Sequence, residues 1–294
     1  MVTRISLRSG VNLDGSPLSA VEVERRALRR QVSIRSALIS LASTLVLGFI
    51  VWLTVVNTPG WALVQKSFFD PKNGIASFPS VLAGLWVNVQ ILFYSVIGVA
   101  VFATLIAIVR TLRGPVFFPL RLLATLYTDL FRGTPLIIVL YLVGFGIPGL
   151  GVFGRIDPLV LGTVALIITY SAYVAEVLRA GIQAVHPSQR LAARSLGLSH
   201  AQTLRLVVLP QAVRKVLPVL MNDFVSMQKD VGLVSVLGAI DAVRAAYIQT
   251  SITYNFTPYV VAGILFVLIS LPFIRLTDWL SARAQRREQI GGLV

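Results

Sequence analysis

Runs of apolar residues long enough to cross a lipid bilayer constrain this chain more than any other feature. The first run covers residues 36–56 without a single charged side chain, and about 20 helical residues suffice to span a hydrocarbon core of about 30 Å. Hydrophobic residues make up 56% of the 294 positions and charged residues only 13%. Because this balance excludes an ordinary soluble globular protein, we expect an all-α protein that crosses a membrane several times.

Six apolar segments of this kind can be placed along the chain. They cover residues 36–56, 81–109, 116–147, 159–177, 216–238 and 258–279. The third is too long for a straight span, since its residues would extend about 48 Å as one helix. We expect a break at residues 132–135, where a glycine relaxes the backbone and a proline removes a hydrogen-bond donor.

The distribution of positive charge predicts the orientation of the spans. Most of the 26 lysines and arginines lie in residues 1–35, 110–121, 176–215 and 279–294. The intervening connections contain only Lys66, Lys72, Arg155 and Arg244. Since cytoplasmic loops carry the excess of lysine and arginine, we expect both termini in the cytoplasm and six spans between them.

The chain is therefore expected to divide into five parts. A cytoplasmic tail (residues 1–35) precedes the first transmembrane helix (36–56) and an external loop (57–80). A membrane core (81–280) and a second cytoplasmic tail (281–294) complete the chain.

The longest polar stretch between two of these spans covers residues 186–210, which we call the knob. Gly197 is a natural helix stop, and Ser199 with Gln202 forms the S-x-x-Q pattern that starts a new helix. Apolar residues at helical spacing continue to Pro210, where we expect the second helix to end. The pattern predicts a compact helix-turn-helix.

The knob is basic, because it carries Arg190, Arg194 and Arg205. On its own it would suit a helix-turn-helix that reads DNA. Because spans flank it on both sides, docking against another protein at the membrane surface is the favoured interpretation. Cytoplasmic loops, rather than nucleic-acid binding, likewise explain the formal net charge of +14.

No motif for catalysis or nucleotide binding occurs in the chain. The phosphate-binding pattern G-x-x-x-x-G-K-[ST] is absent, and there is no cysteine for disulfide, thiolate or metal chemistry. The two histidines, His186 and His200, lie in the same loop and are interpreted as solvated. We expect a chain that is not an enzyme and holds no cofactor or metal, so that a partner must perform any nucleotide hydrolysis.

The fifth apolar segment contains most of the polar residues placed at membrane depth. These are Asn222, Asp223, Gln228, Lys229 and Asp230. A charged side chain at the bilayer centre costs about 2.5 to 3.5 kcal/mol, so Lys229 and Asp230 need partners on another helix, on a second subunit or in a water-filled pathway. A gating charge network and direct contact with a charged substrate both remain open. Asp129 and Arg132, three residues apart, are close enough to satisfy each other and are interpreted as structural.

The knob resembles the EAA loop of bacterial ABC-importer permeases. That loop reads E-A-A, three residues, glycine, nine residues, isoleucine, one residue, Leu-Pro. Here residues 191–193 read Leu-Ala-Ala, Gly197 follows after three residues, and residues 207–210 read Val-Val-Leu-Pro after nine. The branch that transports polar amino acids is also similar at residues 131–136, 175–183, 209–212 and 229–235.

This resemblance implies the fold of a type I (MetI-like) importer membrane domain with six transmembrane helices. It also implies that residues 176–211 form the loop that couples the permease to its ATPase. The coupling contacts would come from Leu191, Ala192, Ala193, Arg194, Gly197, Leu209 and Pro210. Asn222, Asp223, Lys229 and Asp230 would then lie in the translocation pathway or its gate.

The resemblance also implies the partners of the chain. They are a dimer of cytoplasmic ATPases that binds ATP and Mg, a second permease subunit that is identical or homologous, and an extracytoplasmic solute-binding protein. The substrate would be a polar amino acid or a close relative that crosses the cytoplasmic membrane. Nucleic acid is not an expected partner.

Two departures from the family pattern affect these expectations. Leu191 stands where the family has its leading glutamate, so an ion pair of that glutamate with the ATPase is absent. Val231 and Gly232 replace the hydroxyl residues that commonly follow Lys-Asp. Two alternatives remain beside an importer permease: an ion-coupled secondary transporter that uses Asp223, Lys229 and Asp230, and a membrane-anchored DNA-binding protein.

Overall fold

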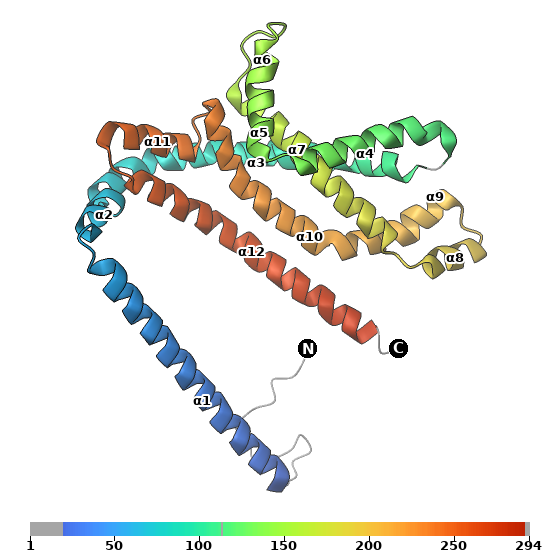
Figure 1. Ribbon diagram of the computed structural model, residues 1–294. Helices are drawn as coiled ribbons and strands as arrows, with labels where there is room; N and C mark the ends of the chain where they lie inside the picture. Colours follow the sequence, from blue (N-terminus) through green and yellow to red (C-terminus); the bar gives the residue numbers. More distant parts are fainter. Residues whose placement is uncertain (1–19, 113, 292–294) are drawn as a thin grey trace. The chain divides into compact units, whose positions relative to one another are not determined.

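The computed structural model describes residues 20–112 and 114–291, and nearly all of these residues are helical (Figure 1). The described residues form two units, which divide after Val64. Most of the expected N-terminal tail, residues 1–19, lies outside the described residues.

The first unit is dominated by one long helix. Helix α1 (Ala20–Val51) continues into a wide π-helical turn, η1 (Trp52–Val56). Neither glycine nor proline occurs between residues 20 and 47, so nothing interrupts the helix where the basic tail meets the first span. Residues 31–56 are long and apolar enough to cross a membrane, as predicted for residues 36–56.

The expected loop over residues 57–80 is mostly helical, so this expectation is wrong in its secondary structure. Helix α2 (Trp61–Phe68) is followed by α3 (Pro71–Thr111). The Asp70 carboxylate accepts a hydrogen bond of 2.9 Å from the backbone N–H of Lys72 and caps α3. Pro71 occupies the first turn, where a missing N–H costs nothing. Proline therefore starts a helix here instead of marking a loop.

The predicted break at residues 132–135 is confirmed. Helix α4 (Phe118–Gly133) follows a short 3₁₀ turn, η2 (Pro115–Phe117), and α5 (Leu136–Tyr141) starts directly after Pro135. The two helices are bent by 108°. A π-helical turn, η3 (Leu142–Gly146), and a single turn, α6 (Ile147–Gly149), extend α5.

Helix α7 (Pro158–Gln183) lies at the centre of the second unit and packs against α3, α4, α5 and α10. Small residues allow these close approaches, as is common between membrane helices. A Cβ atom added at Gly162 would lie 2.2 Å from Val234, and one added at Gly181 would lie 2.3 Å from Val216. The core around α7 includes Ile91, Leu140, Leu166, Val231 and Val234.

The knob forms α8 (Pro187–Ser195) and α9 (His200–Thr203), with α9 running through a π-helical turn, η4 (Leu204–Val208), into α10 (Leu209–Asp230). The second helix therefore does not end at Pro210, contrary to expectation. Pro210 sits in the first turn of α10, directly after the wide π turn. The chain stays helical although Pro210 cannot donate a backbone hydrogen bond, and the wide π turn lies directly before this interruption.

The fifth and sixth spans complete the second unit. After Asp230 the chain tightens into a 3₁₀ segment, η5 (Val231–Leu237), followed by α11 (Ala242–Thr253) and α12 (Thr257–Gly291). In the described part of the chain, four helices are long and apolar enough to cross a membrane, or up to six if each of two bent pairs forms one span. The predicted all-α membrane fold is confirmed.

Candidate functional site

The turn of the knob has the geometry that its sequence predicts. Gly197 adopts φ +80°, a left-handed conformation that side chains rarely tolerate. Its N–H donates to the Arg194 carbonyl at 2.9 Å, and the N–H of Leu198 donates to the Ala193 carbonyl at 3.2 Å. These two bonds close the end of α8 and fix the angle at which α9 leaves it.

The start of α9 is capped as predicted. The backbone N–H of Ser199 donates to the Gln202 side-chain oxygen at 2.8 Å, and the N–H of Gln202 donates to Ser199 Oγ at 3.3 Å. At the start of α8, His186 performs a role that the sequence interpretation missed. Its Nδ1 accepts a hydrogen bond of 3.2 Å from the backbone N–H of Ser188.

A small apolar core joins the knob to the spans on either side. Val185, Val208 and Ala212 are buried together, with Ile182 and Leu204 packed against them. These residues come from the end of α7, the connection to α8, the π turn and the start of α10. The knob therefore packs as one piece with the ends of α7 and α10, which Figure 1 shows beside it.

The residues expected to contact an ATPase divide between the surface and the interior of the knob. Leu191 is 67% exposed, and Ala192, Arg194, Gly197, Leu209 and Pro210 are also exposed. Ala193 is only 4% exposed, so it packs within the knob instead of offering a contact. Leu196 and Leu206 add exposed apolar surface that the sequence analysis did not single out.

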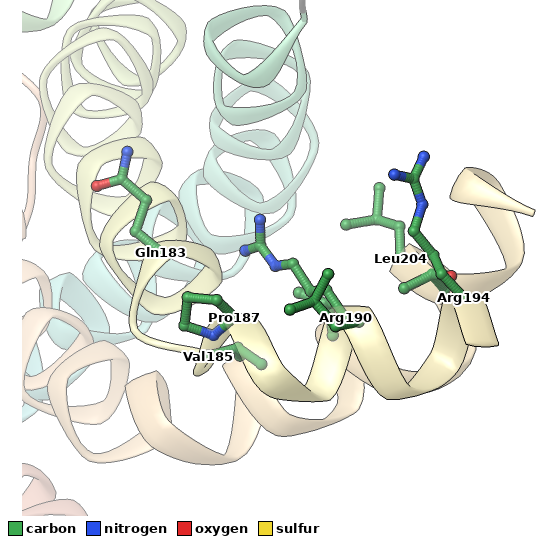
Figure 2. A pocket seen from close by; sticks show the side chains of 9 residues that line it. Gln183, Val185, Pro187, Arg190, Arg194 and Leu204 are labelled. Carbon is green, nitrogen blue, oxygen red and sulfur yellow. The ribbon is translucent and has the colours of Figure 1, made fainter. Parts of the chain in front are cut away.

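A pocket of about 450 Å³ opens on the knob (Figure 2). It is lined by apolar side chains, including Val185, Leu191 and Leu204, together with the two guanidinium groups of Arg190 and Arg194. Figure 2 shows both arginines extending from α8 to the same side. The pocket thus combines an apolar floor with positive charge.

A second cavity, of about 460 Å³, lies at the break between α4 and α5 and is lined by residues of α4, α5, α7 and α10. Arg132, Tyr170, Tyr173, Asp223 and Asp230 are among its lining residues. The Tyr170 hydroxyl donates a hydrogen bond of 2.7 Å to Asp230 Oδ2. Asp223 Oδ2 is buried, and no partner for it exists among the described residues.

The structure separates the four residues predicted for the translocation pathway. Asp223 and Asp230 line the cavity, whereas Asn222 and Lys229 are exposed and do not. Asp129 and Arg132, which the sequence spacing would allow to pair, form no ion pair within the described residues. Arg132 borders the cavity instead.

An ion-pair cluster that the sequence analysis missed lies between α3 and α7. Arg110 Nη1 lies 2.6 Å from Glu176 Oε2, and Arg179 binds the other oxygen of the same carboxylate. The three-residue spacing of Glu176 and Arg179 was visible in the sequence. The contact with Arg110 was not, because it joins residues far apart in the chain.

In residues 20–112 and 114–291, no group of three or more His, Cys, Asp or Glu side chains is arranged to hold a metal ion.

Comparison with known proteins places these features in a family. Residues 114–286 match the family described as binding-protein-dependent transport system inner membrane component. The arginine transport system permease protein ArtQ of Bacillus subtilis (strain 168) is 35% identical over 199 residues, which cover 67% of this chain and 89% of that protein. The probable glutamine ABC transporter permease protein GlnM of the same organism is 34% identical, covering 66% and 90%.

Solved structures agree with these matches. A crystal structure of an amino acid ABC transporter with histidines matches with a TM-score of 0.66 and 37% identity, covering 73% of this chain and 98% of that chain. The MetNI methionine ABC transporter, in an inward-facing conformation, shares the fold with a TM-score of 0.57 at 18% identity, covering 70% and 96%.

The chain therefore belongs to the family of inner membrane components of binding-protein-dependent transport systems. It is a multi-pass inner-membrane protein and the permease subunit of an ABC importer, as the resemblance of the knob predicted. In this family ATP is bound and hydrolysed by a partner ATPase, and a binding protein delivers the solute. The permease itself is not an enzyme and has no cofactor of its own.

Proposed function

We propose that this chain imports a polar amino acid across the inner membrane. The two named relatives support this substrate class, because one is described as an arginine transport permease and the other as a probable glutamine ABC transporter permease. The structure with the highest TM-score among those above is also described as an amino acid transporter. The importer would contain a dimer of ATPases and two permease subunits, identical or homologous.

The knob is the proposed coupling element. Its exposed surface, formed by Leu191, Ala192, Arg194, Leu209 and Pro210, would contact the ATPase. Ala193 and Gly197 would act indirectly, by packing the knob and setting its turn. The observation that carries this proposal is the shared apolar core, through which a push on the knob reaches α7 and α10 together.

The cavity at the α4–α5 break is the proposed part of the translocation pathway. It is lined by two acidic residues, Asp223 and Asp230, and by one basic residue, Arg132. An amino acid carries one positive and one negative group, so both ends find complementary charge here. Asn222 and Lys229, exposed in the single chain, would face the second permease subunit, where a charge at membrane depth finds a partner.

The same proposal includes the side of the membrane on which each segment lies. Residues 1–35 and 281–294 and the loop of residues 176–211 would lie in the cytoplasm, and residues 57–80 outside it. Residues 36–56 would form the first transmembrane helix, and residues 81–280 the permease core. The excess of lysine and arginine in the cytoplasmic segments supports this orientation.

Replacing Gly197 tests the coupling role. In Gly197→Val the β-branched side chain is strained at φ +80°, so the turn must distort although space is open around it. Assembled with its ATPase and binding protein in nanodiscs, the variant should lose most solute-stimulated ATP hydrolysis, about tenfold or more, while basal hydrolysis by the ATPase remains.

Gly151→Val is the matched control. Gly151 also has a left-handed φ, +67°, with open space around it, but it lies in the connection between α6 and α7. Stimulated hydrolysis should stay within about twofold of the unsubstituted protein. Unchanged stimulation in Gly197→Val, or equal losses in both variants, would count against the knob as the coupling element.

A further inference from the structure

The positive charge of the knob has no counter-charge nearby in the sequence. No aspartate or glutamate occurs between Glu176 and Asp223. Glu176 is already bound to Arg110 and Arg179, and Asp223 lines the cavity beside α7. The cationic residues in this interval beyond Arg179 are Arg190, Arg194, Arg205, Arg214 and Lys215. An anion for the knob must therefore come from elsewhere.

The Arg190 side chain is held in place, but only some of its hydrogen-bond donors have partners. One Nη atom donates a hydrogen bond of 2.6 Å to the carbonyl of Ile182, which fixes the guanidinium group against the end of α7. Its Nε atom is buried and has no hydrogen-bond partner within the described ranges. A buried donor without a partner costs about 1 to 3 kcal/mol.

Arg194 presents a second cation to the same pocket. It follows Arg190 by four residues on α8, so the two side chains lie on one face of the helix, as Figure 2 shows. Like charges at this spacing destabilise a helix by about 0.2 to 0.5 kcal/mol. The pocket between them is open and large enough for a side chain, and its remaining walls include Val185, Leu204 and Val208.

The exposed Leu191 lies at the same pocket. The family pattern has a glutamate at this position. Because this chain has leucine there, the permease contributes no negative charge to the contact at this position. The two guanidinium groups and the apolar walls suit a carboxylate that stands on an apolar stem. Guanidinium and carboxylate form strong charge-assisted hydrogen bonds.

We propose that the pocket binds the carboxylate of an aspartate or glutamate side chain of the partner ATPase, held by Arg190 and Arg194, with Leu191 packed beside it. This inference rests on the proposed coupling function and names the chemistry of the contact. In a contact made through the family's leading glutamate, the permease would supply the negative charge. Here the permease supplies the positive charges and the ATPase supplies the negative one.

Removing one guanidinium group tests the contact. The full chain is placed in nanodiscs of neutral lipid, the cognate ATPase is titrated, and its dissociation constant is measured for Arg194→Gln. The control is Arg205→Gln, which removes the same charge from an exposed position that does not line the pocket. Arg194→Gln should weaken binding about tenfold or more, and Arg205→Gln by less than about threefold.

A second pair of variants separates charge from geometry. Arg194→Lys keeps the charge but loses the planar fork of donors, so it should recover only part of the affinity. Arg190→Gln should weaken binding at least as much as Arg194→Gln. The thermal unfolding temperature of each variant is measured alongside, because Arg190 also holds the end of α7.

Three results would overturn the proposal. Equal losses in Arg194→Gln and Arg205→Gln would show that only overall charge matters. Full affinity in Arg194→Gln would show that the pocket does not bind the ATPase. A loss that appears only when anionic lipid is added would make a lipid headgroup the occupant. If the unsubstituted chain binds no ATPase, the proposed function itself fails. This result differs from the three above, which all require that the unsubstituted chain binds.

Discussion

At the scale of single residues, the two carboxylates of the membrane cavity are the most costly side chains to place. Asp230 accepts the hydrogen bond of Tyr170, whereas one oxygen of Asp223 is buried without a partner among the described residues. A buried charge without a partner is unfavourable and marks a functional position inside a membrane protein. These two residues are therefore the first candidates for contact with the solute.

Replacing Asp230 should impair transport more than folding. In Asp230→Asn the side chain keeps its size and can still accept the Tyr170 hydrogen bond, but the negative charge is lost. ATP-driven uptake in proteoliposomes should fall about tenfold or more. Asp129→Asn serves as the control, since Asp129 is exposed on α4 and does not line the cavity. Similar uptake in the two variants would contradict the assignment.

Glycine at position 162 is required for packing. A methyl group added there would lie 2.2 Å from Val234, which η5 holds in the core. Overpacking of this kind costs about 1 to 3 kcal/mol, so Gly162→Ala should lower the thermal unfolding temperature of the purified permease. Gly263→Ala is the control, because Gly263 lies inside α12 with no atom within 4 Å of an added Cβ. Equal unfolding temperatures would refute this packing argument.

At the scale of elements, the ion pair between Arg110 and Glu176 ties α3 to α7. Both side chains are largely buried, with 11% and 19% exposure. Arg110→Gln should therefore destabilise the permease by about 2 to 3 kcal/mol, measured by unfolding in detergent. Arg275→Gln is the control, because Arg275 and Asp278 form an exposed pair at 3.7 Å, which contributes little. Equal losses of stability would show that the buried Arg110–Glu176 pair stabilises the permease no more than the exposed pair does.

Elements with local causes are the ones that the sequence predicted. The turn at Gly197 and the cap formed by Ser199 and Gln202 depend on residues within one helical turn, and both are present. The break at residues 132–135 has the same local origin. Hydropathy likewise predicted the membrane-spanning segments, because it depends only on composition along the chain.

Errors arose where proline was interpreted without its position in the helix. Pro210 was expected to end a helix but lies in the first turn of α10, and Pro71 begins α3 within a segment that was expected to be a loop. Long-range contacts were not predictable for a different reason. The contact between Arg110 and Glu176, like the cavity that gathers Arg132, Tyr170 and Asp223, depends on how distant helices pack.

At the scale of the whole importer, the second unit connects the coupling element directly to the proposed pathway. The knob joins α7 to α10, and these two helices carry Tyr170 and Asp230 on the wall of the cavity. A rigid displacement of the knob would therefore move Tyr170 and Asp230 together relative to the α4–α5 break, which lines the same cavity through Arg132.

The central claim is that ATP hydrolysis by a separate subunit drives transport through this chain. Uptake of radiolabelled arginine, glutamine and glutamate is measured in proteoliposomes that contain the permease alone or together with its ATPase and binding protein. The account predicts uptake of at least one of these amino acids only in the complete assembly with ATP, and none by the permease alone under a proton or sodium gradient. Gradient-driven uptake by the permease alone, indifferent to ATP, would contradict it.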